Sequence, residues 1–189
     1  MERENLPSPF VGSKIKLRAV EKDDVEAILK HWNTYQTRRF LVNVMPMSRR
    51  MEEEWIEQVT ANQKMGKEYV FVIERLSDGE LLGTCGLHSI SWIHRNAVLG
   101  IAIYNPANWN KGYGTETMQM LLNIGFNFLN LHRIELEVLE NNPRAISVYK
   151  KVGFKEVGRR REAVYLEGTY IDSITMDILR NEYRNIKNE

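Results

Sequence analysis

The sequence contains a single cysteine, Cys85, and no long apolar run. One cysteine excludes an intrachain disulfide and a cysteine-rich zinc site. No stretch reaches the about 18 apolar residues that a membrane-spanning helix needs, and the first residues lack the apolar segment of a signal peptide. We therefore expect a cytoplasmic protein that binds neither a metal nor a membrane.

An excess of one charge is missing as well. The 26 Lys and Arg residues face 25 Asp and Glu residues, which leaves a formal charge of +1. This balance argues against a partner as large and acidic as a nucleic acid, which favours a strongly basic surface. It leaves room for a local site for a small anion. The length of 189 residues suits a single domain, expected over residues 1–189 with a core at about 14–183.

Hydrophobic patterning predicts alternating helices and strands. Short apolar or alternating runs predict strands, and apolar residues at helical spacing predict helices. The expected strands cover residues 14–20, 69–74, 81–90, 97–104, 133–139 and two segments within 154–179. The expected helices cover 24–32, a segment starting at Ser48, a segment starting near Gly112, and 143–153. Turns are expected at 77–79 and 167–168. This order predicts a mixed α/β fold, with one sheet and helices on its faces.

The segment at residues 101–115 carries the strongest chemical signal. A strand ends, a loop with Pro106 follows, and Gly112 and Gly114 open a helix. The free amides of a helix's first turn attract anions, and Lys111 adds a positive charge. The pattern predicts a cradle for a phosphate or diphosphate. The alternative is that the two glycines only allow tight packing of strand and helix.

Two familiar phosphate loops fit this segment poorly. A Walker loop needs Gly-Lys followed by Ser or Thr, but Lys111 precedes Gly112. A dinucleotide fingerprint needs a third glycine where Thr117 stands. Glu135 and Glu137 do lie where that fingerprint places its ribose-binding acid, so a dinucleotide-binding domain stays as an alternative.

Three segments, at residues 110–116, 142–146 and 149–154, resemble the GNAT superfamily of acetyl-CoA-dependent N-acetyltransferases. The ending at residues 168–172 and 179–183 resembles the branch that contains ribosomal-protein N-terminal and spermidine N-acetyltransferases. The resemblance implies one GNAT-like domain. Its central sheet would have about seven mostly antiparallel strands, splayed between strands 4 and 5, with helices on both faces.

The resemblance also implies how the coenzyme is bound. Amides of the glycine loop hold the diphosphate of acetyl-CoA, and the edge of the splayed strand pairs with the pantetheine arm. Trp109 stands where the family often has Gln or Arg, so the backbone is expected to hold the diphosphate. Asn142 is expected to contact pantetheine and to cap a helix. The implied cofactor-binding residues are Ala102, Ile103, Tyr104, Trp109, Asn110, Lys111, Gly112, Tyr113, Gly114, Thr115, Asn142 and Tyr149.

Catalytic roles follow from the same resemblance and from the chemistry of acyl transfer. Tyr149 matches the family's proton donor for the departing thiolate, with a packing role as the alternative. The backbone amide of Ile103 is expected to polarise the thioester carbonyl. His88 and the same-face pair Glu135 and Glu137 are the candidate general bases. Each of these three is also explained as an ordinary polar group of a strand, and a water chain is another option.

The acceptor is less defined by the sequence. Arg38, Arg39 and residues 45–51 lie where the family's acceptor-binding helices occur. The early helices carry both charges, so neither a protein N-terminus nor a small amine such as a polyamine is selected. We expect direct transfer from acetyl-CoA to a primary amine, without Cys85 as a nucleophile, in a protein that can pair as a homodimer. A non-catalytic CoA-binding sensor is the alternative function.

Overall fold

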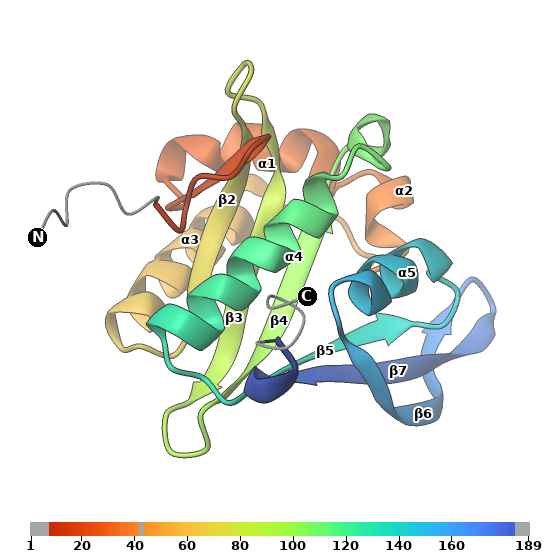
Figure 1. Ribbon diagram of the computed structural model, residues 1–189. Coiled ribbons are helices and arrows are strands. Elements are labelled where there is room, and N and C mark those ends of the chain that lie inside the picture. Colours follow the sequence, from red (N-terminus) through yellow and green to blue (C-terminus); the bar gives the residue numbers. More distant parts are fainter. Residues whose placement is uncertain (1–7, 42–43, 184–189) are drawn as a thin grey trace, which may run out of the picture.

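The strands form one seven-stranded sheet in the order β1-β2-β3-β4-β5-β7-β6. The computed structural model describes residues 8–41 and 44–183. The strands are β1 (Ile15–Arg18), β2 (Tyr69–Arg75), β3 (Leu81–Ser91), β4 (Asn96–Ile103), β5 (Arg133–Leu139), β6 (Lys155–Leu166) and β7 (Thr169–Leu179). The α-helices are α1 (Val25–Trp32), α2 (Tyr35–Arg38), α3 (Arg49–Lys64), α4 (Tyr113–Asn123) and α5 (Pro143–Lys151). Helix α4 lies on one face of the sheet, and α1 and α3 lie on the other (Figure 1).

The sheet opens between β4 and β5. These two strands are parallel, and their ladder covers only residues 96–98 against 133–135. The other neighbouring strands pair in antiparallel fashion. Beyond the short ladder the strands diverge: in Figure 1, β2, β3 and β4 run steeply, whereas β5 and β7 run nearly across the view. The prediction of a mostly antiparallel sheet, splayed between its fourth and fifth strands with helices on both faces, is confirmed.

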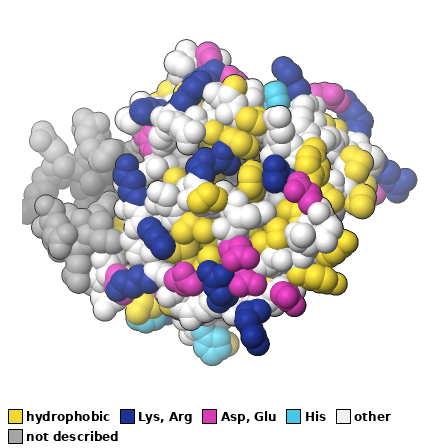
Figure 2. Space-filling model, turned by 90° about the vertical axis from the view of Figure 1, so that its right-hand side faces the viewer, with side chains coloured by type: hydrophobic (Ala, Val, Ile, Leu, Met, Phe, Trp, Pro, Cys, Tyr) yellow, Lys and Arg dark blue, Asp and Glu magenta, His cyan; other side chains and the backbone are white. Residues whose placement is uncertain are grey.

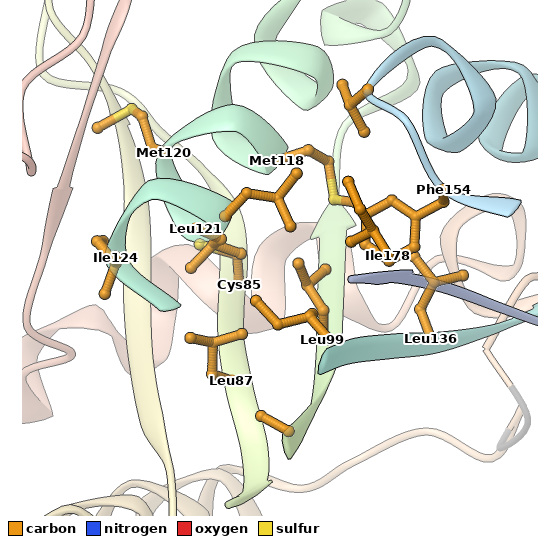
Figure 3. Close-up of a cluster of buried hydrophobic side chains, with 14 of the residues drawn as sticks. Cys85, Leu87, Leu99, Met118, Met120, Leu121, Ile124, Leu136, Phe154 and Ile178 are labelled. Carbon is orange, nitrogen blue, oxygen red and sulfur yellow. The ribbon is translucent and has the colours of Figure 1, made fainter. Parts of the chain in front are cut away.

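The main core lies between the sheet and α4. Met118 and Leu121 of α4 point toward Cys85, Leu87 and Leu99 of β3 and β4 (Figure 3). All five side chains are almost completely buried, and burial of a side chain such as Leu contributes about 1.5–3 kcal/mol. This packing holds α4, and with it the loop that precedes α4, against the sheet.

A second core lies on the opposite face. Val70 and Val72 of β2 pack with Ile28 of α1 and Ile56 of α3. Because successive residues of a strand point to opposite faces, the two cores share the same strands. The splayed edge of β4 is therefore fixed from both sides.

Helix starts follow the predicted caps. The side chain of Ser48 accepts a hydrogen bond from the Met51 amide at 3.2 Å. Asn142 accepts a hydrogen bond from the Ala145 amide at 3.2 Å. Pro143 lies in the first turn of α5, where backbone amides have no partner within the helix, so the missing N–H of proline costs no hydrogen bond. The predicted hairpin turn at Glu167 and Gly168 is also present, with both residues at positive φ.

Three local features were not predicted by the pattern. The short helix α2 is held by a distant contact, because the Thr37 hydroxyl donates to the carbonyl of Tyr104. A 3-10 turn covers Pro106–Asn108. A π-helical turn at Ile124–Phe128 continues α4; a Cβ at Gly125 would lie 2.5 Å from the Ile134 side chain. Each depends on tertiary contacts that local propensity does not contain.

Candidate active site

A cavity of about 870 Å³ opens where β4 and β5 part. Its volume lies within the range of about 300–1,000 Å³ that is typical of small-molecule sites. Its walls come from β4, the loop before α4, β5, α5, the β6–β7 hairpin and the segment around α2. We call this cavity the cleft pocket.

The edge of β4 gives the cleft pocket one of its walls. The Tyr104 amide donates to the Leu82 carbonyl of β3 at 2.9 Å. Because the direction of backbone groups alternates along an antiparallel ladder, the amide of Ile103 points away from β3, into the cleft. The carbonyl of Ile103 points to the same side as its amide. It accepts a hydrogen bond at 2.9 Å from the indole nitrogen of Trp109, which is a residue of the pocket wall. An exposed strand edge of this kind can pair with an extended ligand.

The start of α4 forms a second wall. Gly112 caps the helix with φ +87°, a conformation that favours glycine. Among the described residues, no acceptor takes the amides of Tyr113, Gly114 or Thr115. A Cβ placed on Gly114 would meet no atom within 4 Å. Free amides at the positive end of a helix, facing open space, suit an anionic ligand.

This loop is braced by contacts with Arg75, Glu80 and Ser13, which lie outside the pocket wall. Asn108, which is 5% exposed, accepts from Arg75 Nη1 at 3.2 Å and donates to Glu80 Oε1 at 2.9 Å. On the other side, Glu116 accepts from the Ser13 hydroxyl at 2.8 Å. These contacts keep the amides in place before a ligand arrives, which lowers the cost of binding.

Removal of Arg75 is expected to weaken this bracing. In Arg75→Met, the buried carbonyl of Asn108 loses its donor, which costs about 1–3 kcal/mol. We expect the KM for acetyl-CoA to rise several-fold with kcat nearly unchanged, measured by steady-state kinetics. Arg159→Met is the matched control. Arg75 pairs with Asp78 and Glu80, and Arg159 likewise pairs with Glu140 and Asp172 but has no bond to Asn108. Equal effects of the two substitutions would contradict a specific role for Arg75.

Tyr149 on α5 presents a proton donor to the pocket. Burial raises the pKa of Tyr149 to about 12, against the opposing effect of the nearby Arg144 charge. The phenol is therefore protonated at neutral pH. Its hydroxyl has no hydrogen-bond partner among the described residues, so the proton is free to be donated to a ligand.

Of the three candidate general bases, only Glu137 lines the cleft pocket. His88 Nδ1 lies 2.7 Å from Glu68 Oε2, and Glu135 pairs with Arg133 Nη2 at 2.8 Å. Both lie outside the pocket wall. Glu137 does line the pocket, where Arg160 binds its carboxylate.

The structure brings most of the sequence-predicted binding residues together. The following line the cleft pocket: Ala102, Ile103, Trp109, Asn110, Gly112, Tyr113, Gly114, Thr115, Asn142 and Tyr149. Tyr104 and Lys111 lie outside its wall. The Tyr104 amide is taken by β3, and its ring packs 5.1 Å from Trp32 in the core of the opposite face. The Lys111 carbonyl accepts from Lys14 Nζ at 3.0 Å.

Phe40 and Arg144 are among the pocket residues that the sequence analysis did not assign to the site. Phe40 directly follows the Arg38-Arg39 pair, and Arg144 lies inside the segment at residues 142–146. The Arg144 guanidinium carbon lies 3.4 Å from the Trp109 ring centroid and 5.7 Å from that of Phe40. The second motif could have pointed to Arg144, but nothing in the sequence signals its stacking on Trp109.

Cys85 lies in the main core and is 3% exposed. Burial raises the pKa of its thiol, so the reactive thiolate is disfavoured at neutral pH. Within residues 8–41 and 44–183, no group of three or more His, Cys, Asp or Glu side chains is arranged to hold a metal ion. Over the same residues, every helix is too short or too polar to cross a membrane.

The chain is similar in sequence to known acetyltransferases. A family model described as an acetyltransferase (GNAT) domain matches residues 14–155. Spermidine N(1)-acetyltransferase of Vibrio cholerae is 31% identical over 175 residues, covering 93% of this chain and 98% of the relative. The enzyme of the same name from Escherichia coli K12 is 29% identical over 175 residues, covering 89% and 88%.

A solved structure shows the same fold. The crystal structure of spermidine N-acetyltransferase from Vibrio cholerae in complex with CoA and spermine matches with a TM-score of 0.81. The identity is 31%, over 92% of this chain and 100% of the other. With the glycine loop, the splayed strand edge and the family match in place, the chain belongs to the GNAT acetyltransferase family.

Proposed function

We propose that this protein transfers the acetyl group of acetyl-CoA to the primary amine of a small molecule. The free amides of Tyr113, Gly114 and Thr115, facing open space, carry the proposal. They fit a diphosphate, and the cleft edge of β4 fits the amide groups of a pantetheine arm. The spermidine acetyltransferases among the relatives, one of them solved with CoA, support a small amine as acceptor.

The residues of the pocket supply the steps of this transfer. When bound, acetyl-CoA supplies an activated thioester. The amine nitrogen bonds to the acetyl carbon, the carbon–sulfur bond breaks, and the departing sulfur takes the proton of Tyr149. The proton that the new amide nitrogen loses then restores the phenol of Tyr149 by way of solvent. The Ile103 amide, pointing into the cleft, donates to the carbonyl oxygen as negative charge develops there. The carboxylate of Glu137 is paired with Arg160 and is therefore not free to act as the base. We propose that the amine instead loses its proton to solvent and enters the pocket as the free base.

The pH dependence of the reaction tests this scheme. Below the pKa of the acceptor amine, kcat/KM is expected to rise about tenfold per pH unit, because only the free base attacks. Tyr149, with a pKa of about 12, keeps its proton over this range, so no decline is expected up to about pH 10. Steady-state rates between pH 6 and pH 10, with circular dichroism to monitor folding, measure the profile. A decline between pH 8 and pH 10 in folded protein would show that a different donor titrates there.

A direct assay tests the function itself. Purified protein is incubated with acetyl-CoA and a panel of primary amines, and both CoA thiol release and acetylated product are measured. We expect transfer to at least one amine. Binding of acetyl-CoA without transfer to any amine would indicate a coenzyme sensor. A rise in melting temperature with NAD but not with CoA would indicate a dinucleotide-binding domain.

A cytoplasmic location and a homodimer belong to the same proposal. Strand β6 is the outer edge of the sheet, and residues 155–163 are exposed. Such an edge can pair with another chain. Size-exclusion chromatography with light scattering, over a range of concentrations, measures the state of assembly.

A further inference from the structure

The charges that line the cleft pocket are mostly positive. Arg144, Lys151 and Arg160 reach its wall, whereas Glu137 is the one carboxylate that lines it within the described residues. Arg160 binds that carboxylate, and the Ser173 hydroxyl also lies 3.5 Å from it. A second ammonium group on an acceptor would therefore find no free carboxylate in this wall.

Arg144 has an unusual environment for a charged side chain. It is partly buried, stacked on Trp109 and next to Phe40. Neither Arg144 nor Lys151 forms an ion pair within the part of the chain that the structure describes. Burial lowers the pKa of Arg144, against the opposing effect of Tyr149. Aromatic rings stabilise the flat faces of a guanidinium but leave its N–H groups, which lie in its plane, available to an anion.

Arg144 contacts two parts of the pocket wall that are far apart in the sequence. Trp109 belongs to the glycine loop, where the diphosphate is expected. Phe40 follows α2 and belongs with Thr37 and Leu41 to another part of the wall. Figure 2 shows the side of the molecule that carries α5 and the β6–β7 hairpin. Basic, acidic and hydrophobic side chains are interspersed there, and no broad acidic area is visible that would attract a polycation.

We propose that the acceptor is an amine that also carries a carboxylate, such as an amino acid, and that Arg144 binds this carboxylate. The inference rests on the proposed function and specifies its acceptor. A guanidinium held in a fixed orientation suits the two oxygens of a carboxylate. A polyamine would instead place its second positive charge against Arg144 and Arg160. This chain would then differ in its acceptor from the spermidine acetyltransferases that it resembles.

Matched acceptors test the proposal. Phenylalanine and 2-phenylethylamine differ only in the carboxylate, as do lysine and 1,5-diaminopentane. Phenylalaninamide replaces the carboxylate by a neutral amide, and each kcat/KM is divided by the fraction of acceptor present as the free base, because the basicities of these amines differ. With saturating acetyl-CoA, we expect kcat/KM to be at least about tenfold higher for the carboxylated member of each accepted pair, since a charge-assisted hydrogen bond has that order of effect. A preference for the amines without a carboxylate, or for phenylalaninamide over phenylalanine, would overturn the proposal.

Substitution of Arg144 shows whether this residue binds the carboxylate of the acceptor or a phosphate of the coenzyme. In Arg144→Gln, we expect the KM of the carboxylated acceptor to rise about tenfold or more and the carboxylate preference to disappear. The KM of acetyl-CoA should stay within about twofold. Lys151→Gln is the matched control, because it removes an exposed charge from the same wall and should leave the carboxylate preference intact.

The remaining outcomes are also decisive. If Arg144→Gln raises only the KM of acetyl-CoA, its anion is a phosphate of the coenzyme and the proposal fails, while the proposed function stands. If the native protein binds acetyl-CoA but acetylates no amine, the proposed function fails and the acceptor proposal fails with it. Melting temperatures of the variants, with and without acetyl-CoA, show whether each variant is folded and binds the coenzyme.

Discussion

Replacement of Tyr149 by phenylalanine is expected to lower kcat by about 100-fold or more, because a positioned proton donor contributes a factor of this order. The KM for acetyl-CoA should change little, since the ring and its packing 6.2 Å from Phe154 are retained. Thiol release under saturating acetyl-CoA measures kcat, and titration calorimetry measures coenzyme affinity.

Tyr165→Phe provides the control for Tyr149. It removes the same hydroxyl from an exposed residue of β6 outside the pocket wall, and it should leave kcat unchanged. If Tyr149→Phe retains the native kcat, the departing sulfur takes its proton from elsewhere. The role of Tyr149 would then be limited to packing.

A leucine at position 114 is expected to prevent coenzyme binding without harming the fold. A Cβ on Gly114 meets no atom of the protein within 4 Å, and leucine favours a helix more than glycine does by about 1 kcal/mol. The leucine side chain would enter the space in front of the free amides. We expect the melting temperature to stay the same or rise, while the KM for acetyl-CoA increases at least about 100-fold, which corresponds to about 2.7 kcal/mol.

Gly158→Leu is the matched control for this substitution. Gly158 lies on exposed β6, where the nearest atom to an added Cβ is that of Thr175 at 3.9 Å. This variant should bind acetyl-CoA normally. If Gly114→Leu also binds normally, the space above Gly114 is not part of the coenzyme site.

The glycine loop was readable from the sequence because its chemistry is local. Gly112 must adopt a left-handed conformation and Gly114 must leave space, and both demands act on the residue type itself. The cap at Asn142 is local in the same way, since its side chain satisfies an amide three residues ahead. Short-range patterns of this kind locate the helix starts that border the pocket.

The acceptor side was not readable because its contacts are distant in sequence. Phe40 and Arg144 are far apart in sequence and meet through tertiary contacts, among them the bond from Thr37 of α2 to the end of β4. Likewise, the choice among His88, Glu135 and Glu137 depends on which of them faces the divergence of β4 and β5, and alternation within one strand does not determine this. The prediction that the Tyr104 amide faces the coenzyme was wrong for the same reason. The direction in which a backbone amide points depends on the partner strand, and this amide donates to β3.

The loop before α4 is held in place from behind. The bracing by Arg75 and Asn108 comes from behind the loop, and the core residues of α4 hold the helix against the sheet. The amides therefore need little rearrangement on binding, which favours affinity. Specificity for the acceptor would then arise from other parts of the pocket wall, contributed by α2, α5 and the β6–β7 hairpin.

A crystal structure of the protein with CoA tests the central claim most directly. We predict that diphosphate oxygens lie within about 3.2 Å of the amide nitrogens of Tyr113, Gly114 or Thr115. The pantetheine arm should run along the cleft edge of β4. A bound coenzyme whose diphosphate lies elsewhere, with these amides unoccupied, would contradict the account.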